Sequence, residues 1–293
     1  MDIKKEFRKH FRPRSQTSHK GDFGRIFVLA GSQGLSGACY LTTMAALRSG
    51  AGLVTVGVPK SLVSPLTRRL TEAMMKPLPE TKEGTLSPSA FRQAHTFLQT
   101  QDVLALGPGL SWNRQTQALV RRVVLHSKKP MVIDADGLNA FKGHADSFRK
   151  LKGPAVLTPH AGEFVRLFGG SISKKDQKRK TRAVFVARQF RVIVVLKGHH
   201  TIVASPEGKF YINKTGNPGM ATGGSGDILT GVIAAMLGQK AKSFEAACFG
   251  VFIHGLAGDL AAKKKGEISL VAGDILNALP LAFQKVLRQN RAH

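Results

Sequence analysis

Short runs of apolar and β-branched residues recur along the chain, and each run is nearly continuous instead of alternating with polar positions. Such runs are typical of strands that are buried on both faces of a sheet. The pattern predicts strands at residues 25–30, 53–58, 102–107, 131–135, 155–158, 192–197, 201–204 and 209–212. Only Ser205 to Gly208 separate the last two runs, so we expect these runs to form an antiparallel hairpin.

Longer segments between these runs carry apolar residues at helical spacing. They predict helices at residues 37–49, 61–70, 114–126, 161–168, 176–190, 226–237, 243–263 and 273–289. The alternation of strands with helices indicates a doubly wound α/β domain with a mainly parallel central sheet. No internal repeat or low-complexity linker interrupts it, so we expect one domain over 24–293 that follows a basic N-terminal arm at 1–23. Ligands of such folds bind where the strands end, so the loops after the strands are the expected site.

The composition is that of a globular protein, because 42% of the 293 residues are hydrophobic and 21% are charged. Two cysteines, Cys39 and Cys248, exclude a disulfide framework and favour a reducing compartment. The N-terminus has cations but no apolar stretch after them, which argues against a secretory signal. The most apolar stretch, 246–262, contains His254 and Asp259 and is interpreted as a buried helix. We therefore expect a cytoplasmic protein that does not enter a membrane.

Lys and Arg outnumber Asp and Glu by 44 to 18, which gives a formal net charge of +26. The cations gather at 1–25, 174–182 and 263–265. Segments that bind nucleic acid interleave such cations with exposed aromatic residues, and these clusters offer few, Phe7 and Phe11 among them. We therefore interpret the clusters as solvated surface that lies away from the ligand loops. Binding to nucleic acid, with an affinity that falls steeply with salt, is the alternative from a different functional class.

The segment from Asn217 to Gly231 reads NPGMATGGSGDILTG and runs directly into an apolar helix. Small residues let backbone N–H groups converge on an anion, and a helix N-terminus adds partial positive charge. Residues 223–226 are therefore a candidate cradle for phosphate oxygens, although no Gly-Lys-Ser/Thr sequence makes it a Walker A loop. Asp227 can face a bound phosphate as the base for an attacking hydroxyl, or it can simply cap the helix.

Two further glycine-containing loops follow predicted strands. The loop from Gly31 to Gly37 lacks the G-x-G-x-x-G pattern, which disfavours a Rossmann oxidoreductase. Near Ala38 this loop allows either close approach of a substrate or simple closure of the chain. Residues 107–110, Gly-Pro-Gly-Leu, likewise allow either contact with a ligand or an ordinary tight turn.

Acidic and imidazole side chains end two other strands. Asp134 and Asp136, followed by Asn139, can hold Mg²⁺ through water or accept hydrogen bonds from backbone N–H groups as structural residues. His160 and Glu163 stand at a strand-to-helix turn, where a histidine is either a hydrogen-bonded fixture or a site residue.

The loop at 197–201, Lys-Gly-His-His-Thr, bends between two predicted strands. Lys197 and Thr201 can reach a ribose or a phosphate, and the alternative is a hairpin with incidental polar residues. Each loop alone is a weak signal. Their common position after strands, with a phosphate cradle among them, favours a nucleotide or another small polyanion as the ligand.

Seven of these motifs occur in a fixed order: GSQGLSGA, AALRSGAGLVTVGVP, ALGPGL, VIDADGLN, LTPHAGEF, VLKGHHT and NPGMATGGSGDILTG. Together they closely resemble the ADP/ATP-dependent NAD(P)H-hydrate dehydratases of the ribokinase-like superfamily. The resemblance covers the chain from about Gly24 to about Leu287. The seven motifs in order are specific, whereas GSGD alone would indicate only the wider superfamily.

The resemblance implies a ribokinase-like three-layer α/β/α sandwich and a metabolite-repair lyase. Such an enzyme dehydrates the S form of NADHX or NADPHX to NADH or NADPH, driven by ADP or, less commonly in bacteria, by ATP. It also implies Mg²⁺ as the metal and a homotetramer. Many bacterial relatives carry an N-terminal epimerase domain that interconverts the R and S hydrates. Because few residues precede the first predicted strand, we expect the epimerase to be a separate protein.

For the hydrate, the resemblance implies contacts at Ala38, Gly109, His160 and Asp227, with Asp227 as the catalytic base. For the adenine nucleotide, it implies contacts at Lys197, Gly198, His199, His200, Thr201, Gly224, Ser225 and Gly226. Three more residues are expected to support the site, namely Asp136, Asn139 and Glu163. His199 and His200 stand where family members commonly have smaller residues. A ribokinase-like kinase of the hydroxyethylthiazole type, which keeps its phosphorylated product, is the alternative function.

Overall fold

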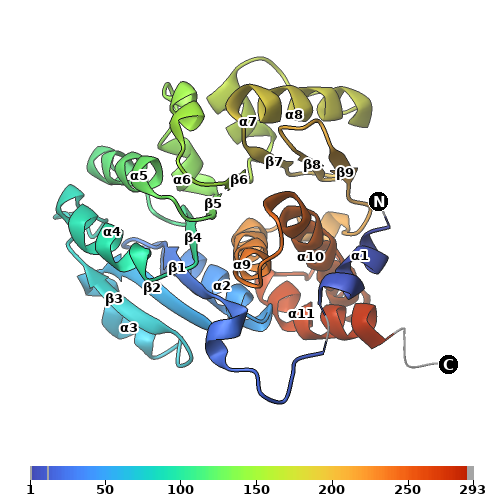
Figure 1. Cartoon of the computed structure of the whole chain (residues 1–293), viewed down its shortest axis with the longest axis horizontal. Helices are drawn as coiled ribbons and strands as arrows, with labels where there is room; N and C mark the ends of the chain where they lie inside the picture. Colours follow the sequence, from blue (N-terminus) through green and yellow to red (C-terminus); the bar gives the residue numbers. More distant parts are fainter. Residues whose placement is uncertain (1, 12, 289–293) are drawn as a thin grey trace.

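The structure is a computed structural model that describes residues 2–11 and 13–288 (Figure 1). Its centre is a nine-stranded sheet in the order β3-β2-β1-β4-β5-β6-β7-β8-β9. The strands are β1 Arg25–Leu29, β2 Leu53–Pro59, β3 Met74–Leu78, β4 Val103–Leu106, β5 Met131–Ile133, β6 Ala155–Leu157, β7 Ile193–Leu196, β8 Ile202–Ala204 and β9 Phe210–Ile212. Strands β1 to β7 pair in parallel, and β8 and β9 are antiparallel. The mainly parallel sheet and the hairpin are therefore confirmed.

Helices cover both faces of the sheet, which gives three layers (Figure 1). One face carries α2 Ser36–Arg48, α9 Ser225–Gly238, α10 Ser243–Lys265 and α11 Ala272–Leu287. The other carries α4 Phe91–Gln99, α5 Arg114–His126, α6 Ala135–Asn139, α7 Ala161–Phe168 and α8 Asp176–Phe190. The sheet separates two clusters of buried side chains, because residues that alternate along its strands face opposite helical layers. The predicted α/β/α sandwich is confirmed.

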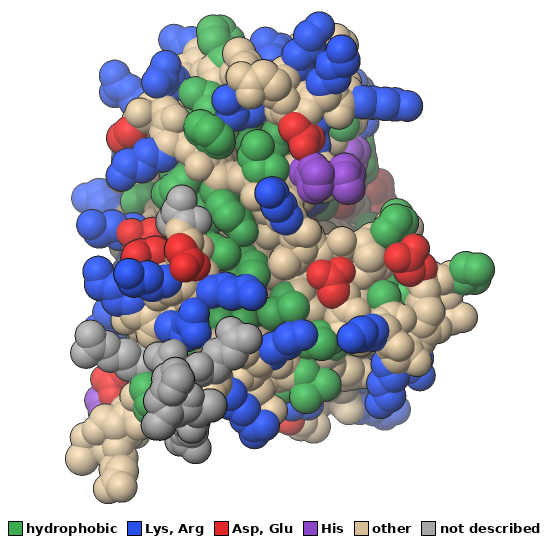
Figure 2. Space-filling model, turned by 90° about the vertical axis from the view of Figure 1, so that its right-hand side faces the viewer, with side chains coloured by type: hydrophobic (Ala, Val, Ile, Leu, Met, Phe, Trp, Pro, Cys, Tyr) green, Lys and Arg blue, Asp and Glu red, His purple; other side chains and the backbone are tan. Residues whose placement is uncertain are grey.

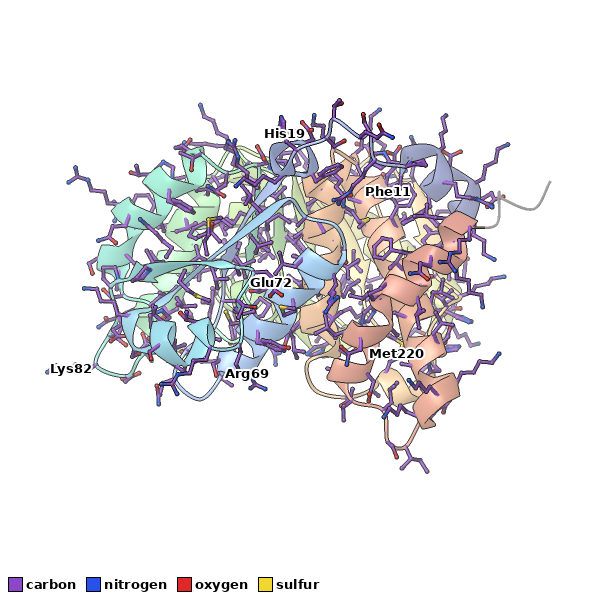
Figure 3. All side chains as sticks on the ribbon, turned by 90° about the horizontal axis from the view of Figure 1, so that it is seen from below. Phe11, His19, Arg69, Glu72, Lys82 and Met220 are labelled. Atoms are coloured by element: carbon purple, nitrogen blue, oxygen red, sulfur yellow. The ribbon has the colours of Figure 1, made fainter. Side chains whose placement is uncertain are left out.

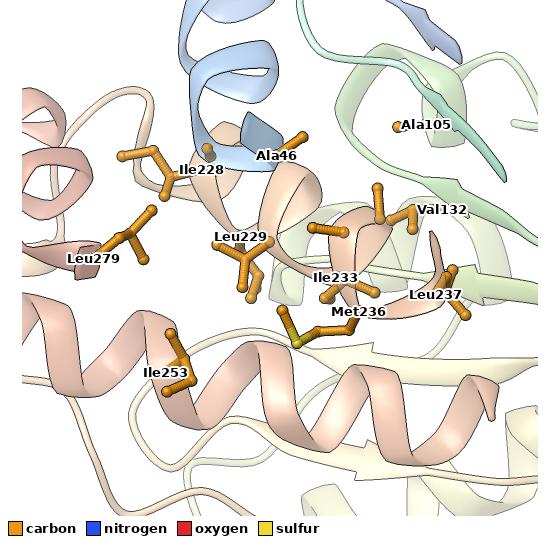
Figure 4. Close-up of a cluster of buried hydrophobic side chains, with 14 of the residues drawn as sticks. Ala46, Ala105, Val132, Ile228, Leu229, Ile233, Met236, Leu237, Ile253 and Leu279 are labelled. Atoms are coloured by element: carbon orange, nitrogen blue, oxygen red, sulfur yellow. The ribbon is translucent and has the colours of Figure 1, made fainter. Parts of the chain in front are cut away.

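Helix α9 is apolar on nearly every side because it packs between the sheet, α2 and α10. Leu229, Ile233 and Met236 fill the space between these layers (Figure 4). A Cβ at Gly231 would lie 2.1 Å from the carbonyl oxygen of Thr42, so only glycine permits this close approach of α2. This packing fixes the N-terminus of α9 at the carboxyl edge of the sheet.

Helix α10 is the one helix among the described residues that is long and apolar enough to cross a membrane, yet most of it is buried inside the fold. It contains the stretch 246–262, so the interpretation of this stretch as a buried helix is confirmed. Its apolarity comes from its position between α9 and α11.

Several predicted bounds are wrong, and some elements were not predicted. The segment at 61–70 forms only η2 Lys60–Leu62 and α3 Val63–Thr67, with Pro65 inside α3. Strand β3 carries a lysine and a proline, which an edge strand tolerates and which conceal it in the sequence pattern. Helices α4 and α6 were also not predicted. The last predicted helix ends at Leu287 in the structure, and position 289 lies outside the described residues.

The basic N-terminal segment contains helix α1 Ile3–His10, which was not predicted. Phe7 of α1 is fully buried, with its ring centroid 5.2 Å from that of Phe249 in α10. Phe11, which Figure 3 labels, follows α1. Its ring packs against the rings of Phe7 and Phe249. The segment therefore contributes apolar side chains to the core on the α10–α11 side, in addition to its cations. Short 3-10 turns complete the chain at η1 Lys20–Phe23, η3 Pro88–Ala90, η4 Ala145–Lys150 and η5 Pro218–Met220.

Candidate functional site

A cleft of about 900 Å³ opens at the carboxyl edge of the sheet. Its walls come from the loop after β7, from the segment between β9 and α9, and from α10. Most of the predicted nucleotide-binding residues line it, namely Lys197, Gly198, His199, His200, Thr201, Ser225 and Gly226. The eighth, Gly224, directly precedes Ser225 as the N-cap of α9. The structure thus brings two loops together that lie about 25 residues apart in the sequence.

The first turn of α9 has free backbone donors. Gly224 has a φ of +88°, a left-handed conformation that strains a residue with a Cβ, and a Cβ there would also displace the end of the Leu41 side chain, whose Cδ1 would lie 2.4 Å away. The N–H groups of Gly224, Gly226 and Asp227 find no acceptor among the described residues. Unpaired N–H groups at a helix N-terminus attract an anion, since the helix dipole adds positive charge. This geometry agrees with the predicted phosphate cradle.

Asp227 lies in this same turn and is half-buried. Among the described residues its carboxylate accepts no hydrogen bond, so the alternative of a simple helix cap is not supported. Burial raises the pKa of Asp227 to about 6, the charge of Asp134 adds to this, and Lys197 partly opposes it. A carboxylate with this pKa is suited to accept a proton near neutral pH.

Lys197 projects from the end of β7 toward the cradle, and its Nζ lies 3.2 Å from the position of a Cβ on Gly226. Its ammonium donates to Asp134 Oδ1 at 2.7 Å and lies 3.8 Å from Glu163 Oε2. Burial would lower the pKa of Lys197, but the Asp134 and Glu163 charges outweigh it and raise the pKa. Lys197 is therefore a charged neighbour of the cradle that is already paired with buried carboxylates.

Asp134 is almost fully buried at the end of β5. Thr230 of α9 donates to its other carboxylate oxygen at 2.8 Å, so Asp134 links β5, β7 and the first turns of α9. Sequence reasoning placed Asp134 beside a possible metal and missed this role. These hydrogen bonds make Asp134 a structural residue, but its partners are side chains and not the backbone N–H groups of the structural alternative.

The residues predicted to contact the hydrate lie partly outside the cleft. Among them, only His160 lines the cleft. Ala38 and Gly109 are neighbours, since a Cβ placed on Gly109 would lie 3.1 Å from the Cβ of Ala38. His160 is the N-cap of α7, and its Nδ1 accepts hydrogen bonds from the N–H groups of Gly162 and Glu163. His160 is thus both a hydrogen-bonded fixture and part of the cleft wall.

The supporting residues hold neighbouring loops. Asp136 accepts a hydrogen bond of 2.8 Å from the N–H of Ser111, and Asn139 donates to Asp136 at 3.3 Å. The Glu163 carboxylate accepts a hydrogen bond from the N–H of His160, and burial raises the pKa of Glu163. Asp134 and Asp136 are therefore already engaged, and the described residues contain no group of three or more His, Cys, Asp or Glu side chains that could hold a metal. These residues do not fit a Mg²⁺ ion held by the protein alone.

His254 of α10 also lines the cleft, although sequence reasoning treated it only as an interruption of an apolar stretch. It is 9% exposed, and its Nε2 lies 3.3 Å from Oγ of Ser225 in the cradle. Burial lowers the pKa of His254 to about 4, so the ring is neutral near pH 7. A histidine within an otherwise apolar helix was the available signal for this residue.

One expectation about the charge clusters is wrong. The cluster at 174–182 does not lie away from the ligand loops, because Arg179 donates hydrogen bonds to carbonyl oxygens of the loop at 197–201. On the face that Figure 2 shows, Lys and Arg side chains are spread over the surface, with a few acidic side chains between them. No sequence pattern indicates the Arg179 contacts, because they join separate elements.

Comparison with known proteins identifies the fold and the family. The family model described as NAD(P)H-hydrate dehydratase matches residues 26–281, which is most of the chain. The chain belongs to the NAD(P)H-hydrate dehydratase family. Among its relatives is the bifunctional NAD(P)H-hydrate repair enzyme Nnr of Moorella thermoacetica, 45% identical over 94% of this chain and 52% of the relative. The chain thus spans about half the length of several curated relatives that it matches.

Other members of the family have a length close to that of this chain. The ADP-dependent (S)-NAD(P)H-hydrate dehydratase of Neisseria meningitidis is 36% identical over 92% of this chain and 88% of the relative. The crystal structure of the ADP/ATP-dependent NAD(P)H-hydrate dehydratase from Bacillus subtilis, co-crystallised with ATP/Mg²⁺, superposes with a TM-score of 0.84. It is 30% identical and covers 97% of both chains. A crystal structure described as a ribokinase-like superfamily protein, from Enterococcus faecalis, is 30% identical, covers 97% of this chain and 94% of its own, and superposes with a TM-score of 0.81, which confirms the expected ribokinase-like fold.

Proposed function

We propose that this member of the family dehydrates the S form of NADHX and NADPHX, with ADP as the phosphoryl donor. The observation that carries the proposal is a carboxylate with a pKa of about 6 in the same helical turn as three backbone N–H groups that have no acceptor in the described part of the chain. The donors suit a phosphoryl group, and the carboxylate suits removal of a proton from the hydroxyl that attacks it. The names of the Neisseria and Bacillus relatives support the same chemistry.

The reaction follows from what each group can do. The C6 hydroxyl of the hydrate attacks the terminal phosphorus of ADP while Asp227 accepts the hydroxyl proton. The bond between this phosphorus and the bridging oxygen breaks, and its electron pair leaves with AMP. The N–H groups of Gly224 and Gly226 stabilise negative charge on the transferring phosphoryl group. The ring nitrogen then expels phosphate, and loss of a ring proton restores the dihydronicotinamide.

The nucleotide and the hydrate bind in different parts of the site. The nucleotide occupies the cleft between residues 197–201 and the cradle, and the hydrate enters from the side of Ala38 and Gly109. Because Asp134 and Asp136 are already engaged, a Mg²⁺ ion would arrive with the nucleotide phosphates, which are ligands that it commonly uses. The homotetramer, the cytoplasmic location and a separate epimerase remain predictions.

The test is to incubate the protein with NADHX, ADP and Mg²⁺ and to follow the absorbance of the dihydronicotinamide ring. We expect recovery of NADH with one AMP and one phosphate released for each ring restored. ATP in place of ADP establishes the preferred donor. Failure of both nucleotides to restore NADH would overturn the proposal. Accumulation of a stable phosphoester without free phosphate would instead indicate the kinase alternative.

A further inference from the structure

Helix α8 begins directly against the loop at 197–201, next to the β7–β9 end of the sheet (Figure 1). Arg179, in its first turn, is only 7% exposed. Its guanidinium donates hydrogen bonds to the carbonyl oxygens of Leu196, Lys197, His199 and His200. One buried side chain therefore satisfies most of the carbonyl oxygens of a loop that has no regular secondary structure.

These contacts fix the direction of the loop's N–H groups. The C=O and N–H groups of a trans peptide unit point in opposite directions, and the described chain contains no cis peptide bond. Because the carbonyls of Lys197, His199 and His200 face Arg179, the N–H groups that follow them, on Gly198, His200 and Thr201, point away from α8. Gly198 and His200 line the cleft, and their N–H groups have no acceptor among the described residues. The N–H of Thr201 instead faces the carbonyl oxygen of Gly198 across a tight turn. The loop thus presents two donors to the space opposite the cradle.

A second contact from α8 holds the strained part of the loop. His200 has a φ of +52°, which is unusual for a residue other than glycine. Its Nδ1 lies 2.6 Å from Oδ2 of Asp176, and the other oxygen of Asp176 accepts a hydrogen bond from Arg179. The hydrogen bond with His200 lowers the pKa of Asp176. Asp176 therefore ties the side chain of His200 to the residue that binds the loop carbonyls.

We propose that Arg179 and Asp176 are positioning residues for the nucleotide: from behind the loop, they hold the N–H groups of Gly198 and His200 toward the cleft. Neither residue lines the cleft, so both act through the loop. This inference rests on the proposed function in one respect, namely that the ligand of the cleft is an adenine nucleotide. It assigns a role to part of a basic cluster whose charge suggested only solvated surface.

Arg179→Lys tests this role, because lysine keeps the charge but cannot reach several carbonyls with one planar fork. Arg182→Lys is the matched control, since Arg182 lies on the same helix and donates to the carbonyls of Phe168 and Gly169 at the end of α7. By calorimetry with ADP, we expect Arg179→Lys to raise the Kd at least about tenfold through lost preorganisation of the loop. For Arg182→Lys we expect a change of less than about twofold. KM for NADHX should stay near that of the wild type in both variants.

Thermal unfolding separates positioning from folding. A merely structural role would lower the melting temperature in both variants and leave the Kd for ADP unchanged, which would overturn the proposal. If Arg179→Lys does not fold, Asp176→Asn, His200→Ala and the double variant form a cycle measured by the same calorimetry. We expect each single variant to weaken ADP binding and the double variant to weaken it by less than the product of both effects. Multiplicative effects, or no effect, would overturn the coupling of Asp176 to the loop.

Calorimetry with ADP does not depend on turnover. A wild-type protein that binds ADP but converts NADHX with neither ADP nor ATP would overturn the proposed function, while the comparison of Arg179→Lys with Arg182→Lys would still decide the positioning role. A wild-type protein that binds no ADP would overturn ADP as the donor and the positioning role together.

Discussion

Replacing Asp227 by asparagine removes the proposed base and keeps the shape of the side chain. A positioned general base contributes roughly 10²–10⁴-fold to a rate, so we expect kcat to fall at least about a hundredfold. Binding of ADP should be unchanged or slightly stronger, because the substitution removes a negative charge beside the phosphate cradle. In the wild type, kcat/KM should decline as the pH falls through about 6, when Asp227 becomes protonated.

The same substitution should stabilise the protein. The pKa of Asp227 rises from 3.8, the ordinary value for an aspartate in an unfolded chain, to about 6 in the fold, so ionisation of this side chain opposes folding. Above pH 6 the cost is fully present, and it disappears as the pH falls toward 3.8. A shift of this size corresponds to about 3 kcal/mol as an upper value. At pH 8, Asp227→Asn should therefore unfold at a higher denaturant concentration than the wild type, with a smaller difference near pH 5.

The measurements are urea unfolding at several pH values and single-turnover conversion of NADHX. Asp22→Asn is the control. Asp22 is the third residue of the short helix η1, as Asp227 is the third residue of α9, but the Asp22 carboxylate accepts a hydrogen bond from the N–H of His19. This control should show no pH-dependent gain in stability. Turnover of Asp227→Asn within a few-fold of the wild type would refute the assignment of the base. A loss of stability at pH 8 would refute the account of its pKa.

Three further changes have expected results. Gly224→Ala places a Cβ in a left-handed conformation at 2.4 Å from Cδ1 of Leu41, so it should weaken ADP binding in calorimetry by about 1–2 kcal/mol or more; unchanged binding would contradict the cradle. The pKa of His254 is lowered from 6.5 to about 4, so protonation of this ring should remove up to about 3 kcal/mol of unfolding free energy as the pH falls from 6.5 to 4, while protonation of Asp227 acts in the opposite direction. His254→Gln should therefore become more stable relative to the wild type over this pH range, as followed by circular dichroism. Phe7→Ala should cost about 3–5 kcal/mol in chemical unfolding, because Phe7 is fully buried, whereas an unpacked α1 would give almost no loss.

Much of the architecture could be predicted because it depends on local patterns. Six of the seven strands that pair in parallel appear in the sequence as continuous apolar runs. Such runs reflect the burial of these strands on both faces of the sheet. Strand β3 was missed because it lies at the edge, where Lys76 and Pro77 are tolerated. Helix α1 was missed because its cations dominate the composition, and only the buried side chain of Phe7 reveals its packing.

The candidate site divides in the same way. The glycines of the cradle could be found in the sequence, because a left-handed N-cap and unpaired N–H groups are local backbone properties. The contacts of Arg179 and the proximity of His254 to Ser225 could not, because each joins elements that pack together only in the folded chain. Neither the basic cluster around Arg179 nor the apolar helix that contains His254 has a sequence pattern that predicts such contacts.

The sequence by itself determined the parallel α/β fold, the order of its motifs and the position of an anion cradle at the start of α9. Only the tertiary structure decided how the charges act. Lys197 meets Asp134 across 63 residues, so a cation that seemed free to bind phosphate is paired. Burial and the nearby Asp134 raise the pKa of Asp227 to about 6. The physical reason is that backbone conformation depends on near neighbours in the chain, whereas ionisation depends on the solvent and charges that surround a side chain in space.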